Sequence, residues 1–166
     1  KSTVTRRQRA VDNTPIQPPN TRYKRASPNE PKSKMSAADK PANETERVEA
    51  LHALELLDTL PESEYDDITA LAAHVCGTPM ALISLVDQDR QWFKSRVGVE
   101  VAETPRELAF CAHAILAETY LEVPDATQDA RFADNPLVTG DFHLRFYAGV
   151  PLVDEKGHAL GTICVL

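Results

Sequence analysis

The sequence predicts an α+β domain in which helices pack against an antiparallel β-sheet. Three observations predict this fold class. Two amphipathic helical patterns come first, short apolar strands then occur in pairs joined by tight turns, and the overall order reads α-α-β-β-α-β-loop-β-β. Strands joined by short turns pair antiparallel, and the apolar stripe of a helix is buried against such a sheet.

The first predicted helix covers residues 45–59. Thr45 caps its first turn, and Pro61 ends it because proline lacks a backbone N–H. Its apolar stripe is formed by Ala50, Ala53, Leu54 and Leu57. The second predicted helix runs from Ser63 to a stop at Gly77, and its apolar positions are Tyr65, Ile68, Leu71, Ala72 and Val75.

The next segment predicts a β-hairpin. Residues 80–86 form a continuous apolar run, which is typical of a strand covered on both faces, and residues 87–89 turn the chain. Residues 91–97 then alternate, which places Trp92, Lys94 and Arg96 on one face. These side chains either present an aromatic wall and two cations to an anionic ligand, or cover an apolar edge and face water.

The remaining elements complete the predicted sheet. A third helix is predicted over residues 104–118, with Pro105 at its first position, followed by a strand over 120–123 and a polar loop over 125–140. Two last strands, 144–153 and 158–166, are joined by a turn that contains a glycine. Because the chain stops at Leu166, beside a strand, we expect a closing element to be missing.

Charge divides the 166 residues, whose net formal charge is −7, into two parts. Residues 1–34 hold nine Lys/Arg, two Asp/Glu and five prolines, whereas residues 35–166 hold nine Lys/Arg and 23 Asp/Glu. Residues 1–34 are poor in apolar residues, so residues 1–43 are predicted to be a disordered tail or linker before a domain at 44–166. Met35 would be a natural translation start. The acidic domain argues against a nucleic-acid partner.

Several function classes find no support in the sequence. No apolar run approaches the ~20 residues of a membrane helix, and no phosphate-binding, nucleophile-elbow or zinc-protease motif is present. The odd number of cysteines, Cys76, Cys111 and Cys164, includes no C-x-x-C pair. This usage argues against a disulfide framework or a structural zinc site and predicts a cytoplasmic protein. We expect no catalytic residues and no metal in this chain.

Seven phrases follow one another in an order typical of a known family. They are L-x-L-L-D-T-L-P-E (54–62), I-S-L-V-D-Q-D-R-Q-W-F-K-S-R-V-G (83–98), F-C-A-H-A-I-L (110–116), V-P-D-A (123–126), R-F-A-D-N-P-L-V (131–138), R-F-Y-A-G-V-P-L (145–152) and G-H-A-L-G-T-I-C-V (157–165). Through these phrases, residues 44–166 resemble a GAF domain of the type attached to bacterial sensor histidine kinases and diguanylate cyclases.

The resemblance implies an antiparallel sheet of about six strands, with the N-terminal helices on one side and a ligand pocket, where one is used, on the other. It also implies a final helix beyond Leu166 that runs into an output domain. Members of this family bind cyclic nucleotides, bilins, haem or metabolites, and others only dimerise, so the ligand and any cofactor stay unknown. If this chain has a pocket, we expect its lining to be Trp92, Cys111, His113, Asp125, Phe132 and Tyr147.

Cys111 and His113 are the most suggestive pair. Two residues apart on a helix, they point about 200° away from each other, so they do not hold one metal together. A buried thiol and a hydrogen-bonded histidine are the favoured interpretation, and a thiolate sensor would need Arg106 near Cys111. No covalent bilin is expected, because the cysteine and histidine are not adjacent.

We therefore predict a homodimeric sensory module, which binds a small molecule or senses redox state and passes the signal through its flanking helices. The output domain would be a histidine kinase or diguanylate cyclase. One alternative is a ligand-free dimerisation module. Another is a GAF-type free methionine sulfoxide reductase, although the loop 123–140 carries no cysteine and Cys164 is predicted to pack in the core.

Overall fold

The structure is a computed structural model that describes residues 37–166. Predictions for the basic segment 1–34 and for Met35 lie outside the described residues. The helical elements are α1 (Glu44–Ala53), α2 (Ser63–Cys76), the 3-10 turn η1 (Arg106–Leu108), α3 (Phe110–Ala114) and α4 (Pro136–Thr139). The strands are β1 (Ala81–Val86), β2 (Arg90–Val97), β3 (Glu103–Pro105), β4 (Leu121–Val123), β5 (Tyr147–Val153) and β6 (Ala159–Val165).

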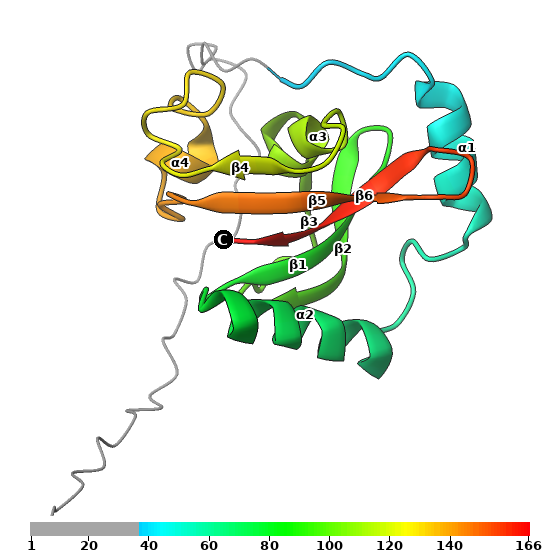
Figure 1. Ribbon diagram of the computed structural model, residues 1–166, viewed down its shortest axis with the longest axis horizontal. Helices are drawn as coiled ribbons and strands as arrows, with labels where there is room; N and C mark the ends of the chain where they lie inside the picture. Colours follow the sequence, from blue (N-terminus) through cyan, green and yellow to red (C-terminus); the bar gives the residue numbers. More distant parts are fainter. Residues whose placement is uncertain (1–36) are drawn as a thin grey trace, which may run out of the picture.

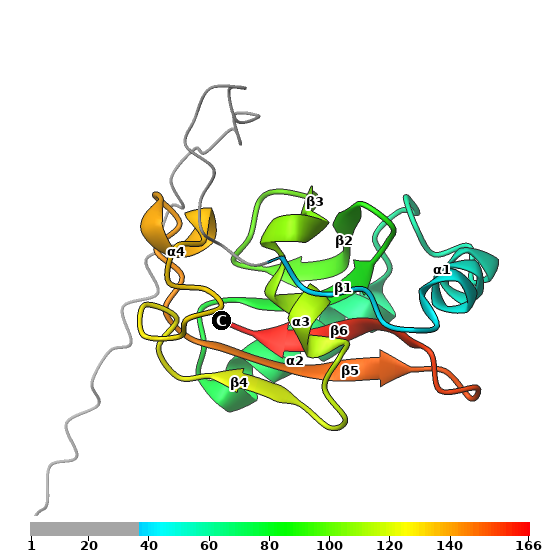
Figure 2. The same cartoon turned by 90° about the horizontal axis from the view of Figure 1, so that it is seen from above.

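The six strands form one antiparallel sheet in the order β3-β2-β1-β6-β5-β4, which confirms the predicted α+β class. Helix α2 runs along one face of the sheet and α1 lies at its end, while α3 packs against the other face (Figures 1 and 2). The sheet is therefore the middle layer.

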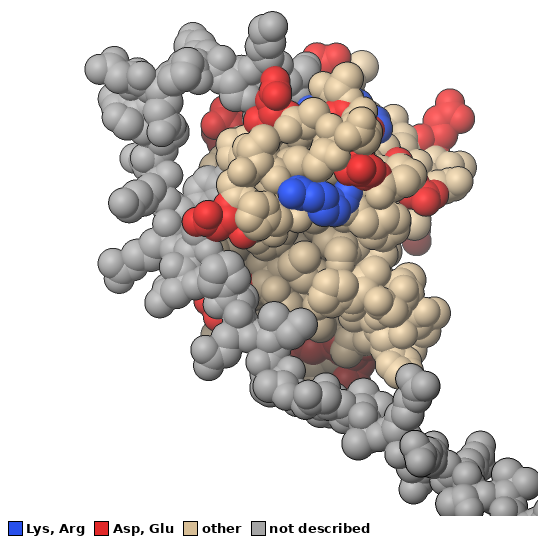
Figure 3. All heavy atoms as spheres, turned by 90° about the vertical axis from the view of Figure 1, so that its left-hand side faces the viewer, with Lys and Arg blue, Asp and Glu red and all other residues tan. Residues whose placement is uncertain are grey.

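In Figure 3 much of the viewed face is uncharged, and acidic side chains lie mainly around its edges.

Helix α1 is shorter than predicted and turned to a different side. It ends at Ala53, because Glu55 and Asp58 then adopt positive φ angles of 52° and 60° that no helix continues through. The predicted stripe is wrong in part, since Ala50 and Leu57 are half-buried against Leu51 but Ala53 and Leu54 are exposed. The fully buried positions of the helix are Arg47 and Leu51. Spacing alone did not indicate that an arginine occupies the inner face.

Helix α2 has the predicted bounds, and Gly77 ends it at a positive φ of 66°. Its buried face is only partly the predicted one, however, because Thr69 and Ala73 face the sheet. Of the predicted positions, Tyr65 and Ala72 are half-buried. Ile68, Leu71 and Val75 are instead 50%, 61% and 73% exposed. Small residues on the inner face allow the helix to approach β1 and β2 closely.

A β-bulge changes the predicted alternation of β2. Ile83 pairs with Ser95 and Ser84 pairs with Phe93, so Lys94 is the extra residue. Lys94 and Ser95 consequently both contact the α2 side, through Glu62 and Asp66 respectively. Arg96 pairs with Leu82 on the other face, so the prediction that it shares a face with Trp92 and Lys94 is wrong, whereas Trp92 and Lys94 do lie on the same face.

The predicted helix over residues 104–118 is largely absent. Thr104 pairs with Gln91 as part of β3, and Ala109 is extended, with φ −78° and ψ 121°. Only Phe110–Ala114 form a helix, α3. The strong local helix-start signal at Thr104 and Pro105 is overridden because β2 offers this segment a non-local strand partner.

Glycine permits one close approach at the centre of the sheet. A Cβ at Gly161 would overlap the carbonyl oxygen of Ser84, so only glycine lets β6 pair here with β1. Within residues 37–166, no helix is both long and apolar enough to cross a bilayer.

Candidate functional site

The sheet face beneath α3 carries a buried group of thiols and hydroxyls. Strand alternation directs Ser84 of β1, Tyr147 of β5, and Thr162 and Cys164 of β6 toward this face, and α3 adds Cys111. Each of the five is at most 2% exposed. We call these five residues the thiol cluster.

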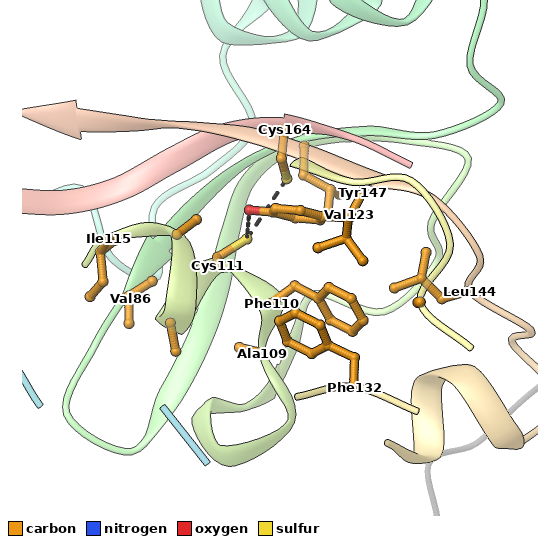
Figure 4. Close-up of a cluster of buried hydrophobic side chains, with 14 of the residues drawn as sticks. Val86, Ala109, Phe110, Cys111, Ile115, Val123, Phe132, Leu144, Tyr147 and Cys164 are labelled. Atoms are coloured by element: carbon orange, nitrogen blue, oxygen red, sulfur yellow. Dashed lines mark hydrogen bonds between the residues drawn. The ribbon is translucent and has the colours of Figure 1, made fainter. Parts of the chain in front are cut away.

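The two sulfur atoms of the thiol cluster are in contact (Figure 4). Cys111 Sγ and Cys164 Sγ lie 3.7 Å apart, and the Tyr147 hydroxyl donates a hydrogen bond of 3.4 Å to Cys111 Sγ. Gly149 makes room for this hydroxyl, because a Cβ there would overlap it. The position of Tyr147 is thus fixed by a neighbour in its own strand.

The hydroxyls of Ser84 and Thr162 lie side by side on paired positions of β1 and β6. Neither side-chain oxygen has a hydrogen-bond partner within the described part of the chain, although both lie close enough to Cys111 to favour its thiolate. A buried hydroxyl without a partner is costly, and the sulfur of Cys111 is the neighbouring group that could accept from these two.

The electrostatics of the cluster separate the two thiols. Burial raises the pKa of the Cys111 thiol, but the Cys164 thiol and the three neighbouring hydroxyls favour the thiolate, which outweighs burial and lowers the pKa to about 7. The pKa of Cys164 is raised well above its usual range, first by its hydrogen bond to Cys111 and then by burial. Burial likewise raises the pKa of Tyr147 well above its ordinary value. The cluster therefore favours the thiolate of Cys111, to which Tyr147 donates, over that of Cys164.

Aromatic rings close the space next to the thiol cluster. Phe110 stacks on Phe132 with ring centroids 3.8 Å apart and planes 10° from parallel, and it lies 5.4 Å from the Tyr147 ring (Figure 4). His113 meets Phe132 edge-on at 4.7 Å. The Arg131 guanidinium lies 5.1 Å above the Phe132 ring. Phe110, Phe132 and Tyr147 are each at most 2% exposed, so these rings belong to the packed core.

The loop between β4 and α4 uses its polar residues to shape itself. Asp125 accepts hydrogen bonds from the backbone and hydroxyl of Thr127, at 2.9 and 2.7 Å, and Asp129 pairs with Arg131. Asn135, 2% exposed, caps α4 by accepting from Leu137 N and donates to Leu108 O. These contacts favour the interpretation of the loop as a set of turns.

The structure brings together four of the six residues predicted to line a pocket: Cys111, His113, Phe132 and Tyr147. Asp125 is exposed at the edge of the same side of the domain, and Trp92 packs on the opposite face with Leu51. Sequence reasoning missed Phe110, Ser84 and Thr162, and it assigned Cys164 to packing alone. A serine in the middle of an apolar strand was the one signal that pointed to Ser84.

An arginine anchors α1 to the far ends of the same strands. The fully buried Arg47 donates to Val86 O of β1 at 2.6 Å and Ala159 O of β6 at 3.4 Å, and it pairs with Glu44 at 2.9 Å. Arg106 also binds Glu44 and donates to Asp87 O. We call Glu44, Arg47 and Arg106 the α1 anchor. Although burial opposes it, hydrogen bonding by the two guanidiniums lowers the pKa of Glu44 to about 2.

Two surface hollows lie away from the thiol cluster. One, of about 350 Å³, is bounded by residues 37–40 and the η1 segment. The other, of about 340 Å³, lies between the α1–α2 connection and the β5–β6 hairpin, and is mainly apolar. Lys94 lines it but is already bound to Glu62, Thr59 and the Leu60 carbonyl. Its charge is therefore satisfied within the chain. No group of three His, Cys, Asp or Glu suited to a metal occurs among residues 37–166.

Comparisons with known proteins agree on the fold. The family model described as the GAF domain matches residues 61–166. A cyclic di-GMP phosphodiesterase, PA2567, of Pseudomonas aeruginosa is 42% identical over 132 residues, which are 80% of this chain and 22% of that protein. The chain thus spans about a fifth of the curated relative it matches.

Two solved structures share the fold at low sequence identity. A free methionine-R-sulfoxide reductase from Neisseria meningitidis, in complex with its substrate, matches with a TM-score of 0.50 and 19% identity, over 79% of this chain and 77% of that one. A structure described as the GAF domain matches with a TM-score of 0.50 and 16% identity, over 76% of each chain. At this identity the two likenesses show the fold alone.

Proposed function

Since the chain belongs to the GAF domain family, we propose that it is a regulatory sensor module in which an event at the thiol cluster changes the packing of α1. The observation that carries the proposal is that β1 and β6 join the two places. Ser84 of β1 and Cys164 of β6 belong to the thiol cluster. The backbone carbonyls of Val86 and Ala159, in the same two strands, accept hydrogen bonds from Arg47 of the α1 anchor. A shift of either strand at the cluster changes what Arg47 binds.

The output we propose is turnover of cyclic di-GMP. The support is the 42% identity to a protein named as a cyclic di-GMP phosphodiesterase. The match covers only 22% of that protein, so most of its length lies outside the part that resembles this chain. A diguanylate cyclase, expected from the sequence, acts on the same second messenger. A histidine kinase output, a homodimeric state and a cytoplasmic location stay predictions that no observation tests.

The test combines binding with a readout of α1. Native mass spectrometry of the chain, before and after denaturation, reveals a co-purified ligand as a mass excess that denaturation removes. Amide hydrogen exchange then compares α1 with and without that ligand, and we expect exchange in residues 44–53 to change. No mass excess and no response of α1 to any candidate signal would favour the ligand-free dimerisation module.

The contact between Cys111 and Cys164 also favours a second candidate, free methionine sulfoxide reduction. That reaction needs an attacking and a resolving thiol near one another, and the structure supplies such a pair at 3.7 Å. The assay is turnover of free methionine sulfoxide with a thiol reductant. Activity that Cys111→Ser abolishes would establish this reaction, and a native protein without turnover would rule it out.

A further inference from the structure

Cys111 and Cys164 are two free thiols, 53 positions apart in the chain, whose sulfur atoms the fold brings into contact. A disulfide needs a sulfur–sulfur distance of about 2.05 Å, so the two sulfur atoms, 3.7 Å apart, must approach each other by about 1.7 Å. The third thiol, Cys76, is exposed at the end of α2 and has no such partner in the described residues.

The polar groups around the pair suit a thiolate better than a thiol. Tyr147 donates to Cys111 Sγ, and the unpartnered hydroxyls of Ser84 and Thr162 lie beside it, fully buried. A neutral thiol is a weak acceptor and leaves these donors nearly unused, whereas a thiolate accepts several hydrogen bonds strongly. Simple packing of a small apolar side chain would not require three hydroxyls around it.

We propose that Cys111 and Cys164 form a peroxide-oxidised dithiol, with Cys111 as the attacking and Cys164 as the resolving thiol. This assignment rests on the proposed sensor function and names the signal that the module detects. The oxidant class is a small hydroperoxide, of which hydrogen peroxide is the simplest.

The reaction proceeds in two balanced steps. The Cys111 thiolate attacks one peroxide oxygen, the O–O bond breaks, and the leaving oxygen takes a proton to give water or an alcohol, so that Cys111 becomes a sulfenic acid. The Cys164 thiolate then attacks the Cys111 sulfur, the S–O bond breaks, and hydroxide leaves as water after taking a proton. Two electrons pass from the two thiols to the peroxide, and a disulfide remains.

The order of the two thiols follows from their surroundings. Tyr147 donates a hydrogen bond to Cys111 Sγ, and the buried hydroxyls of Ser84 and Thr162 lie beside it. The thiolate of Cys111 is therefore the one that its surroundings stabilise, and it is the nucleophile. Cys164 has the higher pKa and ionises readily only after Cys111 is no longer anionic. The same contact therefore supplies both roles.

Burial of both sulfurs selects the oxidant. Access requires local opening of α3, which has only five residues and follows an extended residue, Ala109. A small uncharged hydroperoxide enters through such an opening, whereas a protein disulfide or glutathione disulfide is too large. The disulfide, once formed, ties α3 to β6, the strand that also contacts the α1 anchor through Ala159.

The experiment treats the reduced whole chain with hydrogen peroxide, alkylates the remaining thiols, and measures intact mass and non-reducing peptide maps. We expect a loss of two hydrogens and a Cys111–Cys164 linked peptide in the native protein and in Cys76→Ser, the matched control. Cys111→Ser and Cys164→Ser should give no linked peptide. Modification of Cys76 alone, with Cys111 and Cys164 still alkylatable after denaturation, would overturn the proposal.

A second variant covers the case in which a cysteine variant does not fold. Tyr147→Phe keeps the ring and removes one donor, so disulfide formation should slow several-fold at pH 7 and its pH midpoint should rise above that of the native protein. An unchanged rate and pH midpoint in this variant would contradict the role of the hydroxyls. A purely structural tyrosine would not move that midpoint.

Failure of this inference is distinguishable from failure of the proposed function. A linked peptide without any change of hydrogen exchange in residues 44–53 supports the dithiol and counts against signal transfer to α1. A ligand-dependent change in α1 without any linked peptide supports the sensor function and overturns the dithiol.

Discussion

Replacement of Glu44 tests the anchor between α1 and the sheet. Glu44→Gln keeps the size of the side chain and removes the charge that Arg47 and Arg106 share, leaving two buried guanidiniums with a neutral acceptor. The Glu44 side chain is 16% exposed, so solvent screens it little. Lowering its pKa from 4.5 to about 2 corresponds to about 3 kcal/mol of unfolding free energy at pH 7, which we expect the variant to lose.

The pH dependence has a definite sign. The folded pKa of Glu44 lies below the unfolded one, so its stabilisation is complete above pH 4.5 and is lost as the pH falls toward 2. At pH 3 the native protein retains about 1.4 kcal/mol of it. The glutamine side chain of the variant does not titrate, so the native protein and the variant should converge as the pH is lowered.

The assay is urea unfolding followed by circular dichroism at pH 7, 5 and 3. Glu46→Gln is the matched control, because Glu46 lies in the same first turn and is exposed. We expect the control to change the unfolding free energy by less than about 0.5 kcal/mol at every pH. Equal losses for the two variants, or a Glu44→Gln difference that stays constant down to pH 3, would refute this account of the anchor.

Three further predictions concern single residues. Gly149→Ala should lower the unfolding free energy by about 1–3 kcal/mol, because the new Cβ overlaps the Tyr147 hydroxyl. Measured by urea unfolding, this loss should be smaller in a Tyr147→Phe background, and an equal loss in both backgrounds would contradict the clash. Asn135→Ala should cost about 2–3 kcal/mol by removing a buried cap, whereas Asn43→Ala, at a helix start without a side-chain cap, should cost little. If the protein dimerises through the exposed face of α2, light scattering should show a dimer. Leu71→Glu should dissociate this dimer, and the control Ala70→Glu, at a neighbouring exposed position, should preserve it. A monomeric native protein would exclude this interface.

The sequence predicted those elements whose signals are local. The apolar run before Asp87 defines β1, and the glycine after Cys76 ends α2 where expected. The helix predicted from Thr104 to Glu118 is wrong because the local helix signals compete with pairing to β2, which lies elsewhere in the chain. The inner face of α1 was predicted wrongly for a similar reason. Arg47 is buried there because Glu44 and two strand carbonyls accept its hydrogen bonds, and the strands lie elsewhere in the chain.

The candidate site divides in the same way. Tyr147 was predicted because it alternates with Gly149, whose bare backbone permits close approach of a ligand, and Phe132 because binding residues concentrate in loops on a rigid sheet. Trp92 was placed with them because sequence alone does not show which face of the sheet a strand residue occupies. The contact of Cys111 with Cys164 depends on the position of α3 over β6, which no spacing along the chain encodes.

A buried dithiol suits a regulatory module for an energetic reason. A signal shifts an equilibrium only by the difference in its interaction with two states, and a surface thiol whose oxidation disturbs no packing supplies almost none. Cys111 and Cys164 lie where α3, β1, β5 and β6 meet, so a bond between them must alter close packing that tolerates little displacement. Arg47 donates hydrogen bonds to carbonyl oxygens of β1 and β6, so these bonds depend on the relative position of the two strands. Oxidation at the cluster and the seating of α1 are therefore expected to change together, and variants of the α1 anchor should in turn alter how readily the disulfide forms.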